Sequence, residues 1–158
     1  MSEKKAVNTG VVEQLKRVKI YTDGACSGNP GKGGWAAILV FGNYEKEISG
    51  GVAETTNNRM EITAVIEGLR QLRFRCVVNV YSDSTYVINA FNQNWLRNWK
   101  KNGWLNSARV PVSNRDLWEE LDELQARHVV IWNKVKAHAD HEYNNRCDAL
   151  ARAAIPSD

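Results

Sequence analysis

Four carboxylates in this chain are placed where they could act on one ligand. Asp23 and Asp83 each follow an apolar, strand-like run, and Glu61 and Asp148 each lie beside apolar residues with helical spacing. Ligands of open α/β sheets bind at the carboxyl ends of strands, so the two aspartates lie side by side if their strands are neighbours. A cluster of this kind raises its own pKa values, and its natural partner is a hard divalent cation with oxygen ligands.

Each acid also has a purely structural explanation. Asp23 precedes a glycine in a favourable turn dipeptide, and Asp83 precedes a predicted helix that it could cap. Asn58 and Glu61 have the spacing of a capping box, and Asp148 lies in the first turns of a predicted helix, whose dipole an acid complements. Taken one at a time, these explanations suffice. Only the four acids together indicate a metal site.

The elements that must position these acids follow from the spacing of apolar residues. Ile62, Val65 and Leu69 recur at three- and four-residue intervals, which predicts an amphipathic helix between the third and fourth strands. The predicted strands are 18–22, 34–41, 44–53, 77–82 and 129–134, and the predicted helices are 58–73, 84–92, 115–127 and 144–154. This order predicts an α/β fold, a mixed sheet with right-handed crossovers and helices on its faces.

Length and composition fit one domain of this kind. The chain has 158 residues and a mass of 17.9 kDa, and 43% of its residues are hydrophobic and 25% are charged. These values suit a single cored domain and exclude a disordered or collagen-like chain. The longest apolar run is 35–41, far shorter than the roughly 20 residues of a membrane helix. We place the domain at 17–155 and an N-terminal extension at 1–16.

Export and covalent cross-links are not indicated. Residues 1–17 mix acidic and basic side chains without a continuous apolar core, unlike a secretory signal. Cys26, Cys76 and Cys147 are odd in number and widely spaced, so we expect neither a disulfide framework nor a thiolate zinc site. We expect a monomer in the cytoplasm.

Charge is unevenly distributed, although the net charge is only +3. Residues 84–115 include no acid and five bases, whereas the rest of the chain carries a net −2. Trp95, Trp99 and Trp104 lie in the same stretch, so stacking surfaces accompany phosphate-attracting charge, as in nucleic-acid-binding proteins. The alternative is a solvated helix and loop whose tryptophans face the core.

Four motifs stand in order along the chain. They are Tyr21-Thr22-Asp23-Gly24-Ala25-Cys26 with Gly28-Asn29-Pro30-Gly31, Thr55-Thr56-Asn57-Asn58-Arg59-Met60-Glu61, Tyr81-Ser82-Asp83-Ser84 with Tyr86-Val87, and Lys136-Ala137-His138-Ala139 followed by Arg146-Cys147-Asp148. From about 17 to 154, the chain thereby resembles bacterial-type ribonuclease H, type 1. The resemblance implies the ribonuclease H-like fold, a five-stranded mixed sheet flanked by helices. It also implies cleavage of the RNA strand of an RNA/DNA hybrid.

The same resemblance implies hydrolysis assisted by two metal ions, with products that carry a 5′-phosphate and a 3′-hydroxyl. Asp23, Glu61, Asp83 and Asp148 match the metal-binding carboxylates. Two Mg²⁺ ions, or Mn²⁺ in their place, would orient the attacking water and neutralise the leaving oxygen. Asp23 would bridge the ions, Asp83 and Asp148 would lie on the nucleophile side, and Glu61 on the leaving-group side. His138 matches a mobile loop histidine that assists proton movement or product release.

Substrate contacts are implied in two places. Asn29, Asn57 and Asn58 match positions that read 2′-hydroxyls, which distinguish RNA from DNA, although asparagines beside a helix also serve as caps. Cys26 lies alongside, and Thr56 matches a position that holds a phosphate of the DNA strand. The acid-free stretch matches a basic protrusion that grips the DNA strand, with the contacts Trp95, Trp99, Lys100, Lys101 and Trp104.

Two departures from the family pattern concern the loop and the last acid. Asp140 stands where a small residue is common, and Asn145 stands where glutamate is frequent, three residues before Asp148. Two other functions are compatible with parts of the sequence: a module that coats hybrids or structured RNA without cutting, and a different nuclease of the same fold, such as a junction resolvase. The four acids argue against the first, and the asparagines argue against the second.

Overall fold

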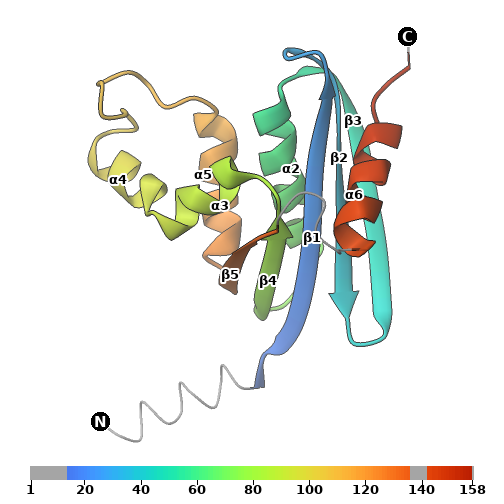
Figure 1. The fold of residues 1–158 in the computed structure, drawn as a ribbon. Coiled ribbons are helices and arrows are strands. Elements are labelled where there is room, and N and C mark those ends of the chain that lie inside the picture. Colours follow the sequence, from blue (N-terminus) through green and yellow to red (C-terminus); the bar gives the residue numbers. More distant parts are fainter. Residues whose placement is uncertain (1–13, 136–141, 158) are drawn as a thin grey trace, which may run out of the picture.

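The computed structural model describes residues 14–135 and 142–157, and in these residues five strands form one mixed sheet (Figure 1). The strands are β1 (Lys16–Ser27), β2 (Gly31–Phe41), β3 (Tyr44–Thr55), β4 (Cys76–Ser82) and β5 (Val129–Lys134). Their order across the sheet is β3-β2-β1-β4-β5. The β1–β2 and β2–β3 pairs are antiparallel, and the β1–β4 and β4–β5 pairs are parallel. The predicted five-stranded mixed sheet is confirmed.

The parallel pairing of β1 with β4 decides where the acids meet. Both strands are rich in β-branched and aromatic residues, which suit a pleated, buried surface. Tyr21 of β1 is paired with Tyr81 of β4. Asp23 and Asp83 each come two residues after this pair, so they reach the same edge of the sheet. The two strands are therefore neighbours, as the sequence argument requires.

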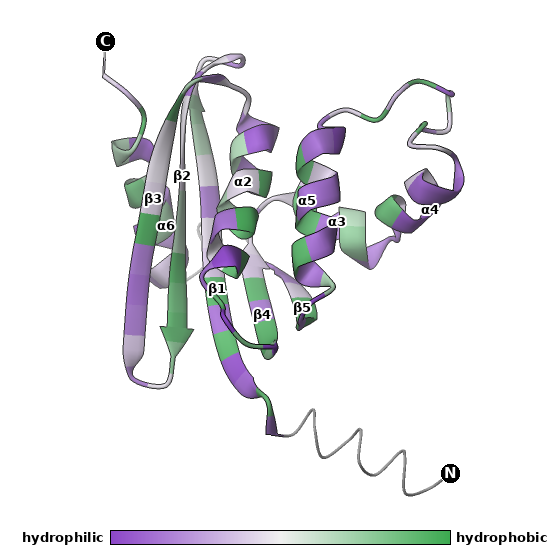
Figure 2. Cartoon of the chain, turned by 180° about the vertical axis from the view of Figure 1, so that it is seen from behind, coloured by the Kyte–Doolittle hydropathy of each residue, from purple (hydrophilic) through white to green (hydrophobic). Residues whose placement is uncertain are grey.

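Helices cover both faces of the sheet (Figures 1 and 2). The helices are α2 (Asn57–Arg70), α3 (Thr85–Asn92), α4 (Trp95–Lys101), α5 (Arg115–Gln125) and α6 (Glu142–Ala153). α2 and α5 pack against each other on one face, and α6 packs on β1 and β2 on the opposite face. α4 and the segment 102–114 extend away from the sheet, and we call residues 95–114 the arm.

The larger hydrophobic core lies between the sheet and the helices α2, α3 and α5. Ile62, Val65 and Leu69 form the buried stripe of α2, as predicted, and Trp118 of α5 is completely buried beside them. In Figure 2, α2 and α5 alternate between hydrophobic and hydrophilic residues, as amphipathic helices do. A smaller cluster beneath α6 contains Cys147.

The helices differ from the prediction in some of their bounds and in one additional helix. α2 ends at Arg70 rather than at 73, and α4 was not predicted. α4 has seven residues and buries only Leu96 completely, so its apolar spacing is too short to be recognised. Within residues 14–135 and 142–157, no helix is long and apolar enough to cross a membrane.

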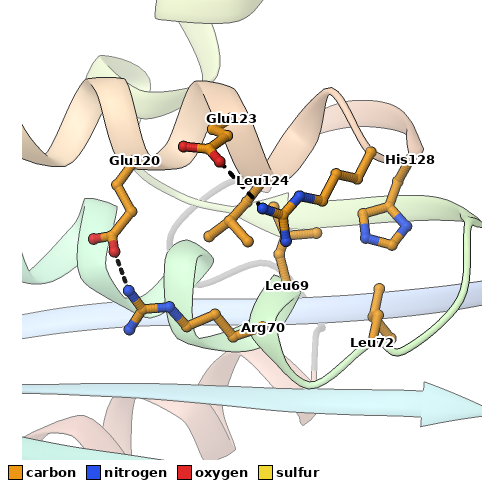
Figure 3. Close-up of a pocket in the computed structure, with 8 residues that line it drawn as sticks. Leu69, Arg70, Leu72, Glu120, Glu123, Leu124 and His128 are labelled. Atoms are coloured by element: carbon orange, nitrogen blue, oxygen red, sulfur yellow. Dashed lines mark hydrogen bonds and ion pairs between the residues drawn. The ribbon is translucent and has the colours of Figure 1, made fainter.

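A cavity of about 280 Å³ lies between the C-terminal ends of α2 and α5 (Figure 3). Its floor is apolar, and ion pairs join Arg70 to Glu120 and Arg127 to Glu123 at its rim. None of the predicted site residues lines this cavity. It is a gap between two packed helices, remote from the sheet edge that carries the acids.

Candidate active site

Asp23 lies in a continuous strand and not in a turn. β1 runs on to Ser27, and Asp23 is only 5% exposed. Its Oδ1 accepts a hydrogen bond of 2.9 Å from the backbone N–H of Gly24. A Cβ at Gly24 would lie 2.5 Å from the backbone nitrogen of Glu61, so only glycine allows the start of α2 to approach β1 this closely. The turn explanation of Asp23 is therefore wrong.

The start of α2 brings the second acid to this strand. The N-cap is Thr56, whose side chain accepts a hydrogen bond of 3.2 Å from the N–H of Arg59, so the capping box of Asn58 and Glu61 is wrong. Glu61 is instead 4% exposed. Its Oε1 accepts a hydrogen bond of 3.1 Å from Gly24, but its Oε2 is buried without a hydrogen-bond partner among the described residues. An unsatisfied buried carboxylate oxygen is destabilising and requires a further partner.

Asp83 completes a close cluster with these two acids. The side chain of Ser84, and not that of Asp83, caps α3 by accepting a hydrogen bond of 3.2 Å from the N–H of Val87. One carboxylate oxygen from each of Asp23, Glu61 and Asp83 lies within 4.8 Å of the others. Three acids from β1, α2 and the end of β4 can therefore hold one ion.

The electrostatics of the cluster are those of like charges held together. Burial, and then the charge of Asp83, raise the pKa of Asp23 to about 7. Burial and the charge of Asp23 raise the pKa of Glu61 well above its usual value. Burial and the charge of Asp148 raise the pKa of Asp83. A divalent cation would reverse each of these shifts, because it stabilises the ionised form of every acid.

Asp148 reaches the site from α6 but is held differently. It lies in the second half of α6, away from the first turn, so the helix-dipole explanation does not apply. It lines a cavity of about 450 Å³ together with Asp23, Glu61 and Asp83. Its carboxylate forms an ion pair of 2.6 Å with Arg152, one helical turn onward. The structure thus brings all four predicted acids to one cavity, and three of them have carboxylate oxygens within 4.8 Å of one another.

Besides Gly24, three residues of this cavity were not predicted as site residues. Ser84, Thr85 and Tyr86 line it directly after Asp83 in the chain. Arg152 was also missed, although its spacing of four residues from Asp148 on a helix is a recognisable sign of an ion pair. For Ser84, Thr85 and Tyr86, the only indication in the sequence was that they directly follow the candidate acid Asp83.

The predicted RNA contacts gather beside the cavity. Asn29 lies in the turn between β1 and β2, and its Oδ1 accepts a hydrogen bond of 3.1 Å from the backbone N–H of Asn57. This bond ties the turn to the start of α2, which Thr56 caps. Asn57 and Asn58 are exposed and line the cavity. The Sγ of Cys26 donates a hydrogen bond of 3.5 Å to the backbone carbonyl oxygen of Thr55, which precedes Thr56. The five residues therefore form one surface at this corner of the molecule.

The predicted tryptophan contacts are half-buried. The ring of Trp99 lies 6.1 Å from Trp95, 6.2 Å from Trp104 and 5.8 Å from Trp118, measured between ring centroids. The three arm tryptophans therefore pack on the core, as the alternative explanation proposed, yet each keeps an accessible part. Trp95 and Trp99 also line a cavity of about 470 Å³ in the arm.

The two predicted lysine contacts differ from each other. Lys100 forms an ion pair with Asp122 of α5, although its side chain is half exposed. Lys101 is exposed, and among the described residues it has no ion pair. His138 and Asp140 lie outside the described residues, and Asn145 is exposed on α6.

Sequence comparison identifies the family of the chain. The family model for RNase H matches residues 15–156. A ribonuclease H of Symbiobacterium thermophilum is 61% identical over 141 residues, which cover 89% of this chain and 96% of the relative. A ribonuclease H of Acetivibrio thermocellus is 59% identical with the same coverage.

Solved structures share the fold. A type 1 RNase H described as having the type 2 active-site motif aligns with a TM-score of 0.79 and 28% identity, over 89% of this chain and 72% of that chain. RNase H1 from Halobacterium salinarum aligns with a TM-score of 0.63 and 26% identity, over 87% and 96%. LC11-RNase H1, solved in complex with an RNA/DNA hybrid, aligns with a TM-score of 0.68 and 23% identity, over the same shares. The chain belongs to the ribonuclease H family of divalent-metal-dependent endoribonucleases.

Proposed function

We propose that this chain hydrolyses the RNA strand of RNA/DNA hybrids with two divalent metal ions, Mg²⁺ or Mn²⁺ in its place, and leaves a 5′-phosphate and a 3′-hydroxyl. Membership of the ribonuclease H family supports the reaction class. One observation supports the metal site most directly. The Oε2 of Glu61 is buried without a hydrogen-bond partner among the described residues, within a cluster of three acids.

The donor set fits a hard divalent cation, because it consists of carboxylate oxygens. Asp23, Glu61, Asp83 and Asp148 would hold the ions. Asp23 would be shared by both ions, since it comes from the central strand β1, with Glu61 and Asp83 beside it in the cluster and Asp148 in the same cavity. Asp83 and Asp148 would serve the nucleophile side, and Glu61 the leaving-group side. When bound, the ions activate a water molecule and neutralise the charge on the leaving oxygen.

The asparagines would select RNA over DNA. An amide side chain both donates and accepts hydrogen bonds, as a 2′-hydroxyl does, and DNA lacks that hydroxyl. Asn57 and Asn58 are exposed beside the acids, and the bond from Asn57 to Asn29 fixes the β1–β2 turn against α2. Cys26 and Thr56 flank this surface, with Thr56 holding a phosphate of the DNA strand.

The arm would hold the DNA strand of the hybrid. The accessible parts of Trp95, Trp99 and Trp104 offer stacking surfaces, and Lys100 and Lys101 attract phosphates. A solved RNase H structure with an RNA/DNA hybrid shows that another protein of this fold binds such a duplex.

His138 and the bounds of the domain complete the proposal. His138 would assist proton movement or product release. The catalytic domain would comprise 17–155 and act as a monomer, because one chain supplies all four acids. Its proposed location is the cytoplasm. Light scattering during size-exclusion chromatography tests the monomer, and a chain that lacks residues 1–13 should cleave at the full rate.

Cleavage of matched substrates tests the function. Purified protein is incubated with end-labelled RNA/DNA hybrid, double-stranded RNA and double-stranded DNA, with Mg²⁺, with Mn²⁺ and with chelator. We expect cleavage of the hybrid alone, in its RNA strand, and only with metal. Internal products whose 5′ ends lose phosphate to a phosphatase would establish the chemistry of the ends. Binding of the hybrid without cleavage, or cleavage of double-stranded DNA, would contradict the proposal.

A further inference from the structure

Three stacked tyrosines connect the elements that carry the three aspartates. The ring of Tyr21 in β1 lies 4.8 Å from Tyr81 in β4, with an interplanar angle of 14°. On its other side, Tyr21 lies 4.5 Å from Tyr143 in α6, with an angle of 17°. Tyr143 is the second residue of α6, and the other two rings of the stack come from the paired parallel strands β1 and β4. The stack therefore joins β4, β1 and the start of α6.

Each ring is close in sequence to one acid of the site. Tyr21 precedes Asp23 by two residues, and side chains two apart on a strand share a face of the sheet. Tyr81 precedes Asp83 by the same interval. Tyr21 thus lies one step back along β1 from Asp23, and Tyr81 lies two residues before Asp83, which directly follows β4.

The first turns of α6 are fixed by contacts at Tyr143. Its hydroxyl donates a hydrogen bond of 2.5 Å to Oε1 of Glu45 in β3. The guanidinium of Arg146 lies 5.1 Å from the centre of its ring and forms ion pairs of 3.0 Å with Glu45 and 2.6 Å with Glu47. The tyrosine ring is thus held on three sides, by Tyr21, by the β2–β3 hairpin and by Arg146.

The second half of α6 is fixed by close backbone packing. A Cβ at Gly34 of β2 would lie 2.1 Å from the carbonyl oxygen of Ala151, so the helix backbone lies directly on the sheet there. Asp148 stands between this point and Tyr143. Its own side chain does not anchor it in the acid cluster, because the carboxylate is paired with Arg152. The position of the helix therefore decides how far Asp148 is from Asp23 and Asp83.

We propose that Tyr143 is a positioning residue that, by stacking on Tyr21, sets the place of Asp148 relative to the other acids and thereby the affinity of the site for divalent cations. This inference rests on the proposed function, which makes Asp148 a metal ligand. Loss of the ring lets the start of α6 move, so that part of the metal-binding free energy is used to bring Asp148 back. Aromatic contacts of this kind correspond to a change of roughly 2- to 10-fold in affinity.

Binding of Mn²⁺ without nucleic acid tests the inference independently of activity. Titration calorimetry on the full chain compares Tyr143→Leu, which removes the ring, with Tyr143→Phe, which keeps the ring and loses the bond to Glu45. Tyr44→Leu is the matched control, because Tyr44 is 64% exposed at the β2–β3 hairpin. We expect Mn²⁺ binding to weaken by roughly 2- to 10-fold in Tyr143→Leu and to stay within about 2-fold of the parent in the other two variants.

Rescue by phenylalanine separates positioning from general destabilisation. Equal Mn²⁺ affinity in Tyr143→Leu and the parent chain would overturn the inference, and so would an equal loss in Tyr143→Phe and Tyr143→Leu. If Tyr143→Leu does not fold, Tyr143→Gln removes the ring with a side chain that suits an exposed helix. Asp148→Asn distinguishes the two levels of the proposal. If Asp148→Asn binds Mn²⁺ as the parent does, Asp148 is not a metal ligand and that part of the proposed function fails. If Asp148→Asn loses Mn²⁺ affinity but Tyr143→Leu does not, only the role of Tyr143 is refuted.

Discussion

The acid cluster and the arm use charge in opposite ways. In the cluster the acids are buried: Asp23 and Glu61 are 5% and 4% exposed and are fixed by β1 and the start of α2. In the arm the aromatic rings are partly buried, and Lys101 and Arg109 are exposed. The acids of the cluster repel one another until a cation binds, whereas the rings of the arm pack together without a ligand. We therefore expect changes in the cluster to alter kcat and changes in the arm to alter hybrid affinity.

The cohesion of the arm comes from its attachment to α3 and α5. The hydroxyl oxygen of Tyr86 in α3 accepts hydrogen bonds of 3.1 Å from Nε1 of Trp118 and 3.2 Å from Nδ2 of Asn114. At the far side, the guanidinium of Arg115 lies 5.2 Å from the centre of the Trp104 ring. The arm is thus a supported platform, and removal of its exposed cations should leave its shape unchanged.

The largest effect is expected from Asp23→Asn. It keeps the size of the side chain and removes the acid shared by both proposed ions, so hybrid cleavage should fall on the order of 1,000-fold or more. Hybrid binding should be nearly unchanged, because the phosphate contacts lie elsewhere. Single-turnover cleavage and a binding titration measure the two quantities. Glu119→Gln, which removes an exposed acid of α5, is the control and should cleave normally. Cleavage by Asp23→Asn near the parent rate would remove Asp23 from the mechanism.

The pH dependence of stability should separate the two regions next. Burial and the charge of Asp83 raise the pKa of Asp23 to about 7 in the folded chain, against the usual 3.8 of an aspartate. Between these values the folded chain binds more protons than the unfolded chain, so its stability falls as pH rises. In chelator, Tm should drop by about 5–10 °C from pH 5 to pH 8, and Mg²⁺ should restore it at pH 8.

The same melting experiment on variants tests whether the acid cluster causes the pH dependence of Tm. Asp23→Asn should flatten the pH profile in chelator and melt higher than the parent at pH 8, since one buried charge is gone. Lys101→Ala should keep the parent profile, because it lies in the arm. A profile for Asp23→Asn as steep as that of the parent would show that the acid cluster is not its cause.

Removal of arm cations should have a smaller effect, and on affinity alone. Replacement of Lys100, Lys101 and Arg109 by alanine should raise KM with little change in kcat. The slope of log affinity against log salt should flatten by about two to three units if all three contact phosphates. Lys100→Ala alone should contribute least, because Lys100 is already paired with Asp122. The salt series is measured on the Asp23→Asn form, with circular dichroism to confirm folding, and an unchanged slope would leave the arm as an ordinary solvated surface.

The acids could be predicted from sequence because their signals are local. An aspartate at the end of an apolar run and a glutamate beside a helical stripe are visible in one chain, whereas the pairing of β1 with β4 stayed a condition that only the structure answers. Contacts between distant segments left no such signal. The bond of Tyr143 to Glu45 joins residues 98 apart, and the stack on Tyr21 depends on where α6 crosses the sheet. The capping residues Thr56 and Ser84 were missed because neighbouring acids and asparagines are equally good caps.

The smallest expected effect concerns Arg152. Its ion pair with Asp148 is exposed, as the charges of the arm are. Asp148 differs from the other acids because its side chain is 45% exposed and paired with a cation that is 66% exposed. A bound ion must replace this guanidinium, so Arg152→Ala should bind Mn²⁺ roughly twofold more tightly, the scale of an exposed ion pair on a helix. Arg152→Lys, which retains the charge, should stay near the parent value, and the difference should shrink at high salt. Calorimetric titration measures all three, and weaker binding by Arg152→Ala would mean that Arg152 holds Asp148 ready for the ion rather than competing with it.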